Sequence, residues 1–467
     1  MSEKHINKSP ISCKSDSTKS PLPQHEGRLG VGIIPQGYKQ TNIGIIPQDW
    51  EVVRLGEVCD FIKTYQNARS DLNDYDEINY IHYGEIHTKY KHFIDFSKAK
   101  LPKINAQKLT KEIQEIAFCQ NGDLVVVDAS EDYTAIAKSA EIQNLDSRAV
   151  AGLHTFLLRD KAKHFVNGFK GYILYNGEVY KELKRLATGI SVLSVSKANL
   201  SNLQIPLPPL KEQEKIARIL GVWDSALTSL ANLIKAKRKY KTALMQRLLT
   251  PPKDKSTHPL APSAREGEQE NSLQVNDRES QSSLRFAGFN DKWQEFRLGD
   301  ICKITTGSLN ANAMVENGEF AFFTCAKEVY AIDNYAFDTE ALLISGNGAN
   351  VGYIHYYNGK FNAYQRTYVL NNFVCDILFV KFFLDRFLKK RISQEKNEGN
   401  TPYIVLSTLQ DMKIQMPNSL AEQKKIAQVL SVCDKEIETL NLKFECLKAQ
   451  KRGLMQQLLS GKVRVKC

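Results

Sequence analysis

A long segment that occurs twice constrains this chain of 467 residues more than any other feature. Residues 212–250 align with residues 422–460 at an offset of 210 and without gaps, and fifteen of the 39 positions are identical. Several identities are polar, which chance similarity between helices rarely produces. They include Glu212/Glu422, Gln213/Gln423 and Asp224/Asp434. The chain is therefore predicted to contain two related halves.

Apolar residues recur in both copies at alternating spacings of four and three. A sustained period of about 3.5 residues predicts a coiled-coil seam, along which each helix packs against a partner. An ordinary core helix is the alternative, but 39 residues far exceeds the usual length of a globular helix. The predicted seam residues are Ile216, Leu220, Trp223, Leu227, Leu230 and Ile234 in the first copy, and Ile426, Leu430, Ile437, Leu440, Phe444 and Leu454 in the second.

The length of these helices predicts how they pair. At about 1.5 Å per residue, each is roughly 58 Å long. The segment between them that is rich in Pro, Ser and Glu, residues 251–285, would span only about 33 Å as a coil. A parallel pairing would require this linker to return along the whole helix. We therefore expect an antiparallel pair with a pseudo-two-fold axis through its middle.

A second, shorter repeat marks the start of each half. The segment from Trp50 to Cys59 parallels the segment from Trp293 to Cys302, whereas the residues that follow differ in length and sequence. The predicted fold class is α+β, with two mixed α/β domains separated by the helices. The predicted parts are a mobile tail at 1–45, a first globular domain at 46–205, a first helix at 206–250, a polar linker at 251–285, a second globular domain at 286–415 and a second helix at 416–467.

Composition excludes several classes of protein. No run of about 18 apolar residues and no apolar signal core is present, so neither membrane insertion nor secretion is expected. Nine cysteines without a Cys-x-x-Cys pair predict neither a disulfide framework nor a zinc site, and favour a cytoplasmic protein.

The formal net charge of +11 is compatible with a polyanionic partner. It is concentrated on the predicted helices. Residues 211–250 hold nine basic and three acidic residues, and residues 421–467 hold ten and five. Contacts of the globular domains with a polyanion must therefore come from local faces.

One such face is expected in residues 80–92, where aromatic residues, histidines and lysines are mixed. Interpreted as a strand, this segment would place Lys89 and Lys91 on phosphates and His87 or Thr88 on bases. A half-buried strand with a solvated edge is equally consistent. No metal site is expected, because positions five apart on a strand face opposite sides and no paired carboxylate completes a set of ligands.

The second candidate face is the Gly- and Asn-rich segment 346–352. Its spacing is one residue too long for a dinucleotide-binding fingerprint, and a strand follows it, so a hairpin turn is predicted. Such a turn could present Asn347 and Asn350 to bases, since carboxamides pair with adenine. Gln365 and Arg366, which follow a turn predicted at Asn358-Gly359, are similar candidates.

The whole pattern resembles the specificity subunits of type I DNA restriction-modification enzymes. The resemblance is carried by Ile46-Pro47-x-x-Trp50-x-x-x-x-Leu55-Gly56-Glu57, by Ile205-Pro206-Leu207-Pro208-Pro209-Leu210-x-Glu212-Gln213-x-x-Ile216-Ala217, and by Leu420-x-Glu422-Gln423-x-x-Ile426-Ala427. It implies that the globular domains are target recognition domains, each reading half of a bipartite double-stranded DNA site. The helices would fix the gap and dock two DNA methyltransferase subunits.

The same resemblance implies that the chain binds no cofactor itself. S-adenosylmethionine, ATP and Mg would be bound by the methyltransferase subunits and by separate motor and nuclease subunits. The chain lacks a P-loop motif and a methyltransferase signature, so it is not expected to be an enzyme by itself. The alternatives are a coiled-coil scaffold joining two protein-binding domains without DNA, and a self-sufficient nuclease or methyltransferase.

Overall fold

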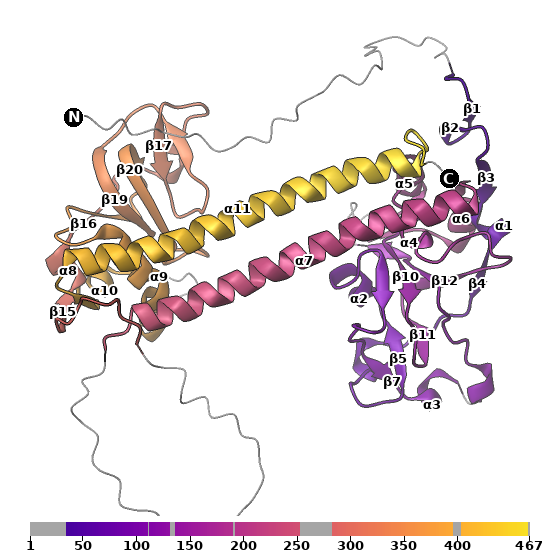
Figure 1. Cartoon of the computed structure of the whole chain (residues 1–467), viewed down its shortest axis with the longest axis horizontal. Coiled ribbons are helices and arrows are strands. Elements are labelled where there is room, and N and C mark those ends of the chain that lie inside the picture. The colour runs from indigo at the N-terminus through magenta and orange to yellow at the C-terminus, as the bar shows by residue number, and fades with distance from the viewer. Residues whose placement is uncertain are drawn as a thin grey trace, which may run out of the picture. The chain divides into compact units, whose positions relative to one another are not determined.

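The computed structural model describes residues 34–110, 112–130, 136–189, 192–252, 283–395 and 403–465. The chain divides into two compact units (Figure 1). Unit 1 comprises residues up to Leu230 together with Lys443–Cys467, and unit 2 comprises Ala231–Leu442. Each unit contains one mixed α/β body and parts of two long helices, and each is described on its own below.

The body of unit 1 is built on a five-stranded sheet. Its central strand, Leu124–Val127, is buried along its whole length, as expected for a run of Leu and Val covered on both faces. The order is β4 (Cys59–Ile62), β12 (Thr155–Asp160), β8 (Leu124–Val127), β10 (Ser139–Gln143) and β6 (Phe93–Asp95). Only β10 and β6 run parallel. A second sheet has the order β11 (Ala149–Ala151), β5 (Ile78–Ile81) and β7 (Lys103–Ile104).

Short helices surround these sheets. They are α1 (Leu55–Val58), α2 (Tyr83–Thr88), α3 (Ala106–Leu109), α4 (Lys170–Ile173), α5 (Gly177–Leu186) and α6 (Lys197–Asn202). Two further strands, β9 (Ala129–Ser130) and β13 (Leu193–Ser194), pair with each other.

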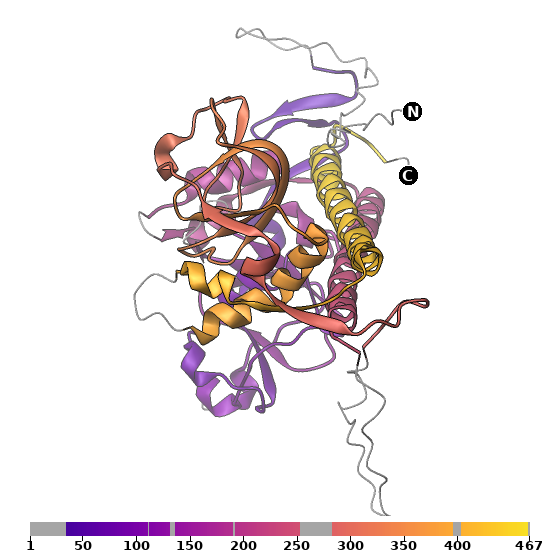
Figure 2. The same ribbon diagram turned by 90° about the vertical axis from the view of Figure 1, so that its left-hand side faces the viewer.

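The body of unit 2 is a six-stranded sheet (Figure 2). Its order is β16 (Lys303–Thr306), β21 (Thr367–Asn371), β19 (Phe337–Ser345), β20 (Ile354–Ala363), β17 (Phe320–Phe323) and β18 (Tyr330–Ile332). The pairing of β17 with β20 is its one parallel ladder among the described strands. Helix α9 (Ile377–Gln394) packs against β19 and β20 and buries a row of Phe and Leu side chains.

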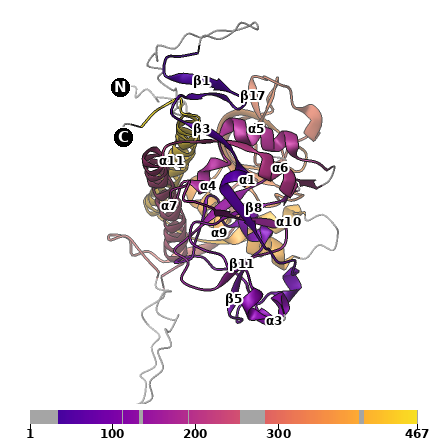
Figure 3. The ribbon, with the colours of Figure 1, turned by 90° about the vertical axis from the view of Figure 1, so that its right-hand side faces the viewer.

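The shorter sequence repeat forms the same frame in each unit. In unit 1, β3 (Glu51–Arg54) pairs antiparallel with β14 (Gln204–Leu207), the strand that leads into the long helix (Figure 3). In unit 2, β15 (Trp293–Arg297) pairs with β22 (Lys413–Pro417) in the same way. Each frame continues into a short helix. In unit 1 this helix is α1, which packs on α6, and in unit 2 it is α8 (Leu298–Ile301), which packs on α10 (Leu406–Gln410). The repeated glycine lies at that contact, since a Cβ on Gly56 would lie 1.9 Å from Ser201 Oγ.

Both predicted long helices are present, as α7 (Leu210–Leu248) and α11 (Leu420–Leu459). None of the twelve predicted seam residues is exposed. Ile216, Leu220, Leu227, Ile234, Ile426 and Leu430 are buried, and Trp223, Leu230, Ile437, Leu440, Phe444 and Leu454 are half-buried. In unit 1, Ile216 and Leu220 share a core with Leu458 and Leu459 of α11. In unit 2, Leu248 shares a core with Ile426 and Leu430.

The segment 80–92 is not the strand that its alternating residues predict. Only β5 is extended, and His82 then caps α2, its imidazole accepting a hydrogen bond of 3.1 Å from the Gly84 N–H. A side-chain N-cap satisfies a backbone donor that would otherwise be unpaired at the start of a helix. His87 and Thr88 are therefore helical, and Lys89 and Lys91 lie in the turn that follows.

The predicted turn at Asn358-Gly359 is also wrong. Both residues lie inside β20, opposite Glu340 and Thr339 of β19. The chain turns instead at residues 364–366, between β20 and β21. The hairpin predicted at 346–352 is confirmed, because β19 and β20 are antiparallel, with Ile344 opposite Ile354. An Asn-Gly pair favours a turn only where both flanking strands can end.

The predicted mobile tail is wrong for its last residues. Strands β1 (Tyr38–Thr41) and β2 (Gly44–Pro47) form an antiparallel hairpin, and the Tyr38 hydroxyl donates to Gly461 O at 2.9 Å. Residues 1–33 of that tail and residues 253–282 of the predicted linker lie outside the described residues. The described end of the linker returns to α7, where Leu284 N donates to Arg247 O at 3.0 Å.

Candidate nucleic-acid interface

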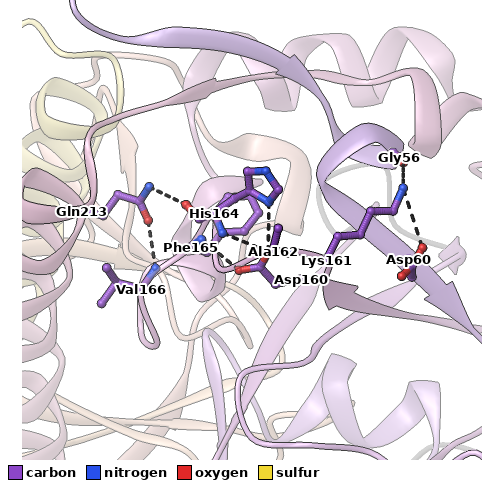
Figure 4. Close-up of polar contacts among 9 residues, drawn as sticks. All are labelled: Gly56, Asp60, Asp160, Lys161, Ala162, His164, Phe165, Val166 and Gln213. Carbon is purple, nitrogen blue, oxygen red and sulfur yellow. Dashed lines mark hydrogen bonds and ion pairs between the residues drawn. The ribbon is translucent and has the colours of Figure 1, made fainter.

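The repeated glutamine attaches each body to its long helix. In unit 1 the buried Gln213 accepts a hydrogen bond from Val166 N (3.0 Å) and donates to His164 O (2.9 Å) (Figure 4). Gln213 also donates to Pro208 O at 2.8 Å. In unit 2, Gln423 accepts from Asp376 N (2.8 Å) and donates to Pro417 O (2.7 Å). Each side chain thus joins a loop of the body to the segment that leads into the helix.

The loop that Gln213 holds is itself rigidly bonded. Asp160 accepts backbone hydrogen bonds from Phe165 N (2.9 Å) and His164 N (3.1 Å). Burial raises the pKa of Asp160, but these donors outweigh burial, and the pKa lies below its usual range. Next in the chain, Lys161 donates to Gly56 O at 2.8 Å and ties the loop to α1.

The repeated glutamate is clamped by an arginine from beyond the other long helix. Glu212, 1% exposed, accepts from Arg464 Nε (2.8 Å) and Nη2 (2.9 Å) and from the Trp50 indole (2.8 Å). Glu422, also 1% exposed, accepts from Arg285 Nε and Nη2, both at 2.9 Å. The bond from Glu212 raises the pKa of Arg464, which remains charged. A bidentate arginine provides the paired charge that a buried carboxylate needs.

Two repeated residues form cross-helix ion pairs. In unit 1, Lys451 of α11 pairs directly with Asp224 of α7, which also accepts from the Tyr172 hydroxyl at 2.6 Å. In unit 2 the roles of the helices are exchanged, and Lys241 of α7 lies 2.5 Å from Asp434 of α11. In each unit an aromatic ring of the body covers the lysine. Lys451 Nζ lies 5.3 Å from the ring centroid of Tyr172, and Lys241 Nζ lies 5.1 Å from that of Phe382.

The candidates of unit 1 lie together at the end of α2, although the polar groups of three of them have partners within the body. His87 Nε2 lies 3.2 Å from Ala129 O, and the Thr88 hydroxyl donates to Gly84 O at 2.7 Å. Lys89 pairs with Glu85 at 2.6 Å, and Lys91 is exposed. The residues from Thr88 to Lys91 line a surface pocket that Lys138 and Tyr175 also line. The last two come from distant parts of the chain, and no local signal singles them out.

The candidates of unit 2 also lie together, at one end of its sheet. Gly346 N donates to Arg366 O at 2.8 Å, which places the turn of Asn347 and Asn350 beside that of Gln365. Asn350 donates to Cys325 O (3.1 Å), and Gln365 donates to Asn310 Oδ1 (3.3 Å). The side chains of Gln365 and Arg366 are exposed. Spacing in sequence gave no indication that these two turns adjoin.

Comparison with known proteins gives these surfaces a context. Residues 47–237 and 290–445 match the family model for the type I restriction modification DNA specificity domain. The chain belongs to this family. The family predicted from the sequence motifs is thereby confirmed, and each half of the chain contains one of its specificity domains.

Similar proteins include type I specificity subunits of known origin. The EcoDI specificity subunit of Escherichia coli is 38% identical over 153 residues, which are 33% of this chain and 34% of that subunit. The chain thus spans about a third of that relative's length. The MjaVIII specificity subunit of Methanocaldococcus jannaschii is 27% identical over 330 residues, covering 63% of this chain and 70% of the relative.

The fold is also that of a solved specificity subunit. The S subunit of the type I restriction-modification system of M. genitalium superposes with a TM-score of 0.53 at 16% identity, over 88% of this chain and 96% of that one. Within the described residues, no helix is long and apolar enough to cross a membrane. The same residues hold no cluster of three or more His, Cys, Asp or Glu side chains arranged to bind a metal ion.

Proposed function

We propose that this chain is the DNA sequence-recognition subunit of a type I restriction-modification complex in the cytoplasm. Each of its two domains would read one half of a bipartite site on duplex DNA. The observation that carries the proposal is that both halves of the chain match the same DNA specificity family. The two matched bodies differ in sheet topology, although each is attached to its long helix by the same strand pair. Since the bodies differ, the half-sites should differ as well.

The long helices are proposed to be an antiparallel coiled coil with pseudo-two-fold symmetry that fixes the gap between half-sites. Three observations support this: the burial of the seam residues, the exchanged Lys–Asp pairs, and the direction of the contacts in unit 2. There, Lys237 contacts Glu436 while Lys241, further along α7, contacts Asp434, earlier in α11. The residue number of the contact thus rises along α7 while it falls along α11, which is the pattern of two antiparallel helices.

Methyltransferase subunits are proposed to dock on the exposed sides of these helices. The proposed complex contains two of them, with motor and nuclease subunits. S-adenosylmethionine, ATP and Mg would be bound by these partners, and this chain would catalyse nothing alone. The boundaries predicted for the two globular domains and the two long helices belong to this proposal, whereas the predicted tail ends before β1.

For DNA contact we propose Lys89 and Lys91 in unit 1, and Asn347, Asn350, Gln365 and Arg366 in unit 2. Lys91, Gln365 and Arg366 have the best support because they are exposed. His87 and Thr88 are weaker candidates for base contact, because a backbone carbonyl already engages the polar group of each. Their side chains would have to exchange those bonds for bonds to bases.

The test is methylome sequencing of the host with and without the gene. We expect one bipartite adenine-methylated motif to disappear on deletion. An unchanged methylome would contradict the proposal and favour a scaffold without DNA recognition. Purified alone, the chain should neither cleave nor methylate DNA with Mg or S-adenosylmethionine, whereas a self-sufficient enzyme would do so.

A further inference from the structure

Two surface pockets of unit 1 adjoin, because Lys91 and Tyr175 line both of them. The first is lined by the turn after α2, from Thr88 to Lys91, and by Lys138 and Tyr175. The second is lined by Lys91, His92, Tyr175 and the face of α11 from Glu445 to Met455. Because they share Lys91 and Tyr175, they run from the recognition domain onto the long helix. We call this feature the lysine groove.

Its lining carries far more positive than negative charge. The basic members are Lys89, Lys91, Lys138, Lys448, Lys451 and Arg452, and the acidic member is Glu445. Lys89, Lys448 and Lys451 have carboxylate partners. Among the described residues, Lys138 donates to the neutral carbonyl of His87 and to no carboxylate. Lys91 and Arg452 are exposed, and no carboxylate among the described residues forms an ion pair with either.

These like charges are crowded. Burial, and then the charge of Lys91, lowers the pKa of Lys138. Burial also lowers the pKa of Lys451. The negative charge of Asp224 raises this pKa, and the positive charge of Lys91 lowers it further, so that the pKa stays below its usual range. An anion placed between these ammonium groups would relieve their repulsion.

The floor of the groove holds Lys91 in place. The Tyr175 hydroxyl lies 2.9 Å from Lys91 O and 3.2 Å from Ser139 O, and can donate to either. Gln456 of α11 donates to Tyr175 O at 2.8 Å, which fixes the helix against the same residue. The cations therefore lie on a rigid support, which reduces the entropy lost on binding.

His92 adds an unused polar atom to this floor. It is 3% exposed, its Nδ1 lies 3.2 Å from Gly171 O, and its Nε2 has no hydrogen-bond partner among the described residues. Burial, and then the charge of Lys451, lowers the pKa of His92 to about 3, so the ring is neutral at pH 7. Its Nδ1 then donates to Gly171 O, and its Nε2 is an acceptor for water or a lysine proton.

We propose that the lysine groove binds the phosphodiester backbone of duplex DNA, so that α11 supplies Arg452 and Lys448 to the DNA contact of unit 1. This inference rests on the proposed function and extends the contact from the recognition domain onto the helix. A row of cations suits a row of phosphates and carries no sequence information. The pair of Lys448 with Glu445 is exposed, so a phosphate can replace Glu445 at little cost.

The experiment uses the full chain assembled with its methyltransferase, carrying Lys91→Gln or Arg452→Gln. Affinity for a duplex with the methylated motif and for one without it is measured over a range of salt concentrations. Each variant should weaken both by a similar factor and reduce the slope of log affinity against log salt by about 0.9. Lys181→Gln, at an exposed position of α5 outside the groove, is the matched control and should leave the slope unchanged.

The outcomes separate the two proposals. If the wild-type complex does not prefer the motif, the proposed function fails. If it does, and both groove variants match Lys181→Gln, the lysine groove does not bind DNA, although the function stands. A third outcome is that the variants lose methyltransferase on size-exclusion chromatography, whereas the chain without methyltransferase binds DNA as tightly as the wild type does. The groove would then be a protein-docking site, and the phosphate proposal would be overturned.

Discussion

At the scale of single residues, unit 1 is closed by residues just beyond α11. Gly461 has a φ of +70°, the left-handed conformation common after a helix end. It lies so close to β2 that a Cβ would be 2.4 Å from Pro47 Cδ and 3.3 Å from Trp50. Three residues later, Arg464 reaches Glu212. The chain must therefore turn sharply at this glycine for the clamp to form.

The first prediction concerns this glycine. Gly461→Ala should lower the free energy of unfolding by roughly 2 kcal/mol, because left-handed backbone alone costs about 1–2 kcal/mol for a residue with a Cβ. The matched control is Gly453→Ala, a helical position of α11 with no atom within 4 Å of the added Cβ. The control should gain up to about 1 kcal/mol. Urea unfolding measures both, and equal signs would contradict the contacts described.

The second prediction concerns His92 and pH. Its folded pKa of about 3 lies below the unfolded value of about 6.5, so between these values only the unfolded chain takes up the proton. Stability should therefore fall as the pH drops from 6.5. His92→Gln should reduce this fall between pH 7.5 and 5.0 in urea unfolding. Parallel curves for wild type and His92→Gln would refute the burial argument.

Sequence could indicate some of these residues but not their roles. Glu212, Gln213 and Asp224 stand out because each is repeated at an offset of 210. The arginine partners of the two repeated glutamates do not stand out, since Arg464 and Arg285 lie outside the aligned segments and at different sequence distances from the ends of α11 and α7. His87 and Thr88 were expected on a strand, because the capping bond of His82 depends on local geometry that residue alternation does not reveal.

At the scale of elements, periodicity over many residues was the reliable guide. The spacing of apolar residues predicted α7 and α11 and their inward faces. Short elements were less predictable, as the Asn358-Gly359 pair inside β20 shows. The ladder between β19 and β20 outweighs the local turn preference there, because eight residue pairs contribute more than one dipeptide.

The third prediction compares the two cross-helix ion pairs. Lys451 is 3% exposed in its pair with Asp224, and Lys241 is 17% exposed beside a 44% exposed Asp434. Asp224→Asn leaves a buried ammonium without its counter-charge and should cost about 3 kcal/mol. Asp434→Asn, the same change at the equivalent position, should cost about 1 kcal/mol because water screens that pair.

Urea unfolding of the two variants, with Lys451→Met and Lys241→Met to complete double-mutant cycles, measures this difference. The coupling free energy should be larger in unit 1. If the two couplings were equal, burial by the body of unit 1 would not be what strengthens its pair.

At the scale of the whole molecule, the duplicated frame was predictable and the bodies were not. The Trp50 and Trp293 segments form equivalent strands in the two units, as their similarity suggested. The five-stranded order β4-β12-β8-β10-β6 has no such signal, because each of its ladders joins segments distant in sequence. Long-range pairings of this kind depend on packing that one sequence does not reveal.

The fourth prediction follows from the separate bodies. Replacing residues 303–410 with the corresponding body of another family member should change one half of the methylated motif and leave the other half intact. Inserting about four residues, one helical turn, into α7 should change only the gap between the halves. Methylome sequencing reads both results, and a change in both half-sites from either alteration would contradict two independent modules separated by a fixed spacer.

The return of the chain to α7 has a practical consequence. Leu284 N donates a hydrogen bond to Arg247 O near the end of α7, and the next residue, Arg285, pairs with Glu422. The segment between Pro252 and Leu284 therefore begins and ends close to the C-terminal end of α7. Lengthening a segment whose ends are already held together costs little closure entropy. A fluorescent protein inserted between Pro252 and Leu284 should therefore leave both units folded. Such an insertion would allow the complex to be imaged in living cells.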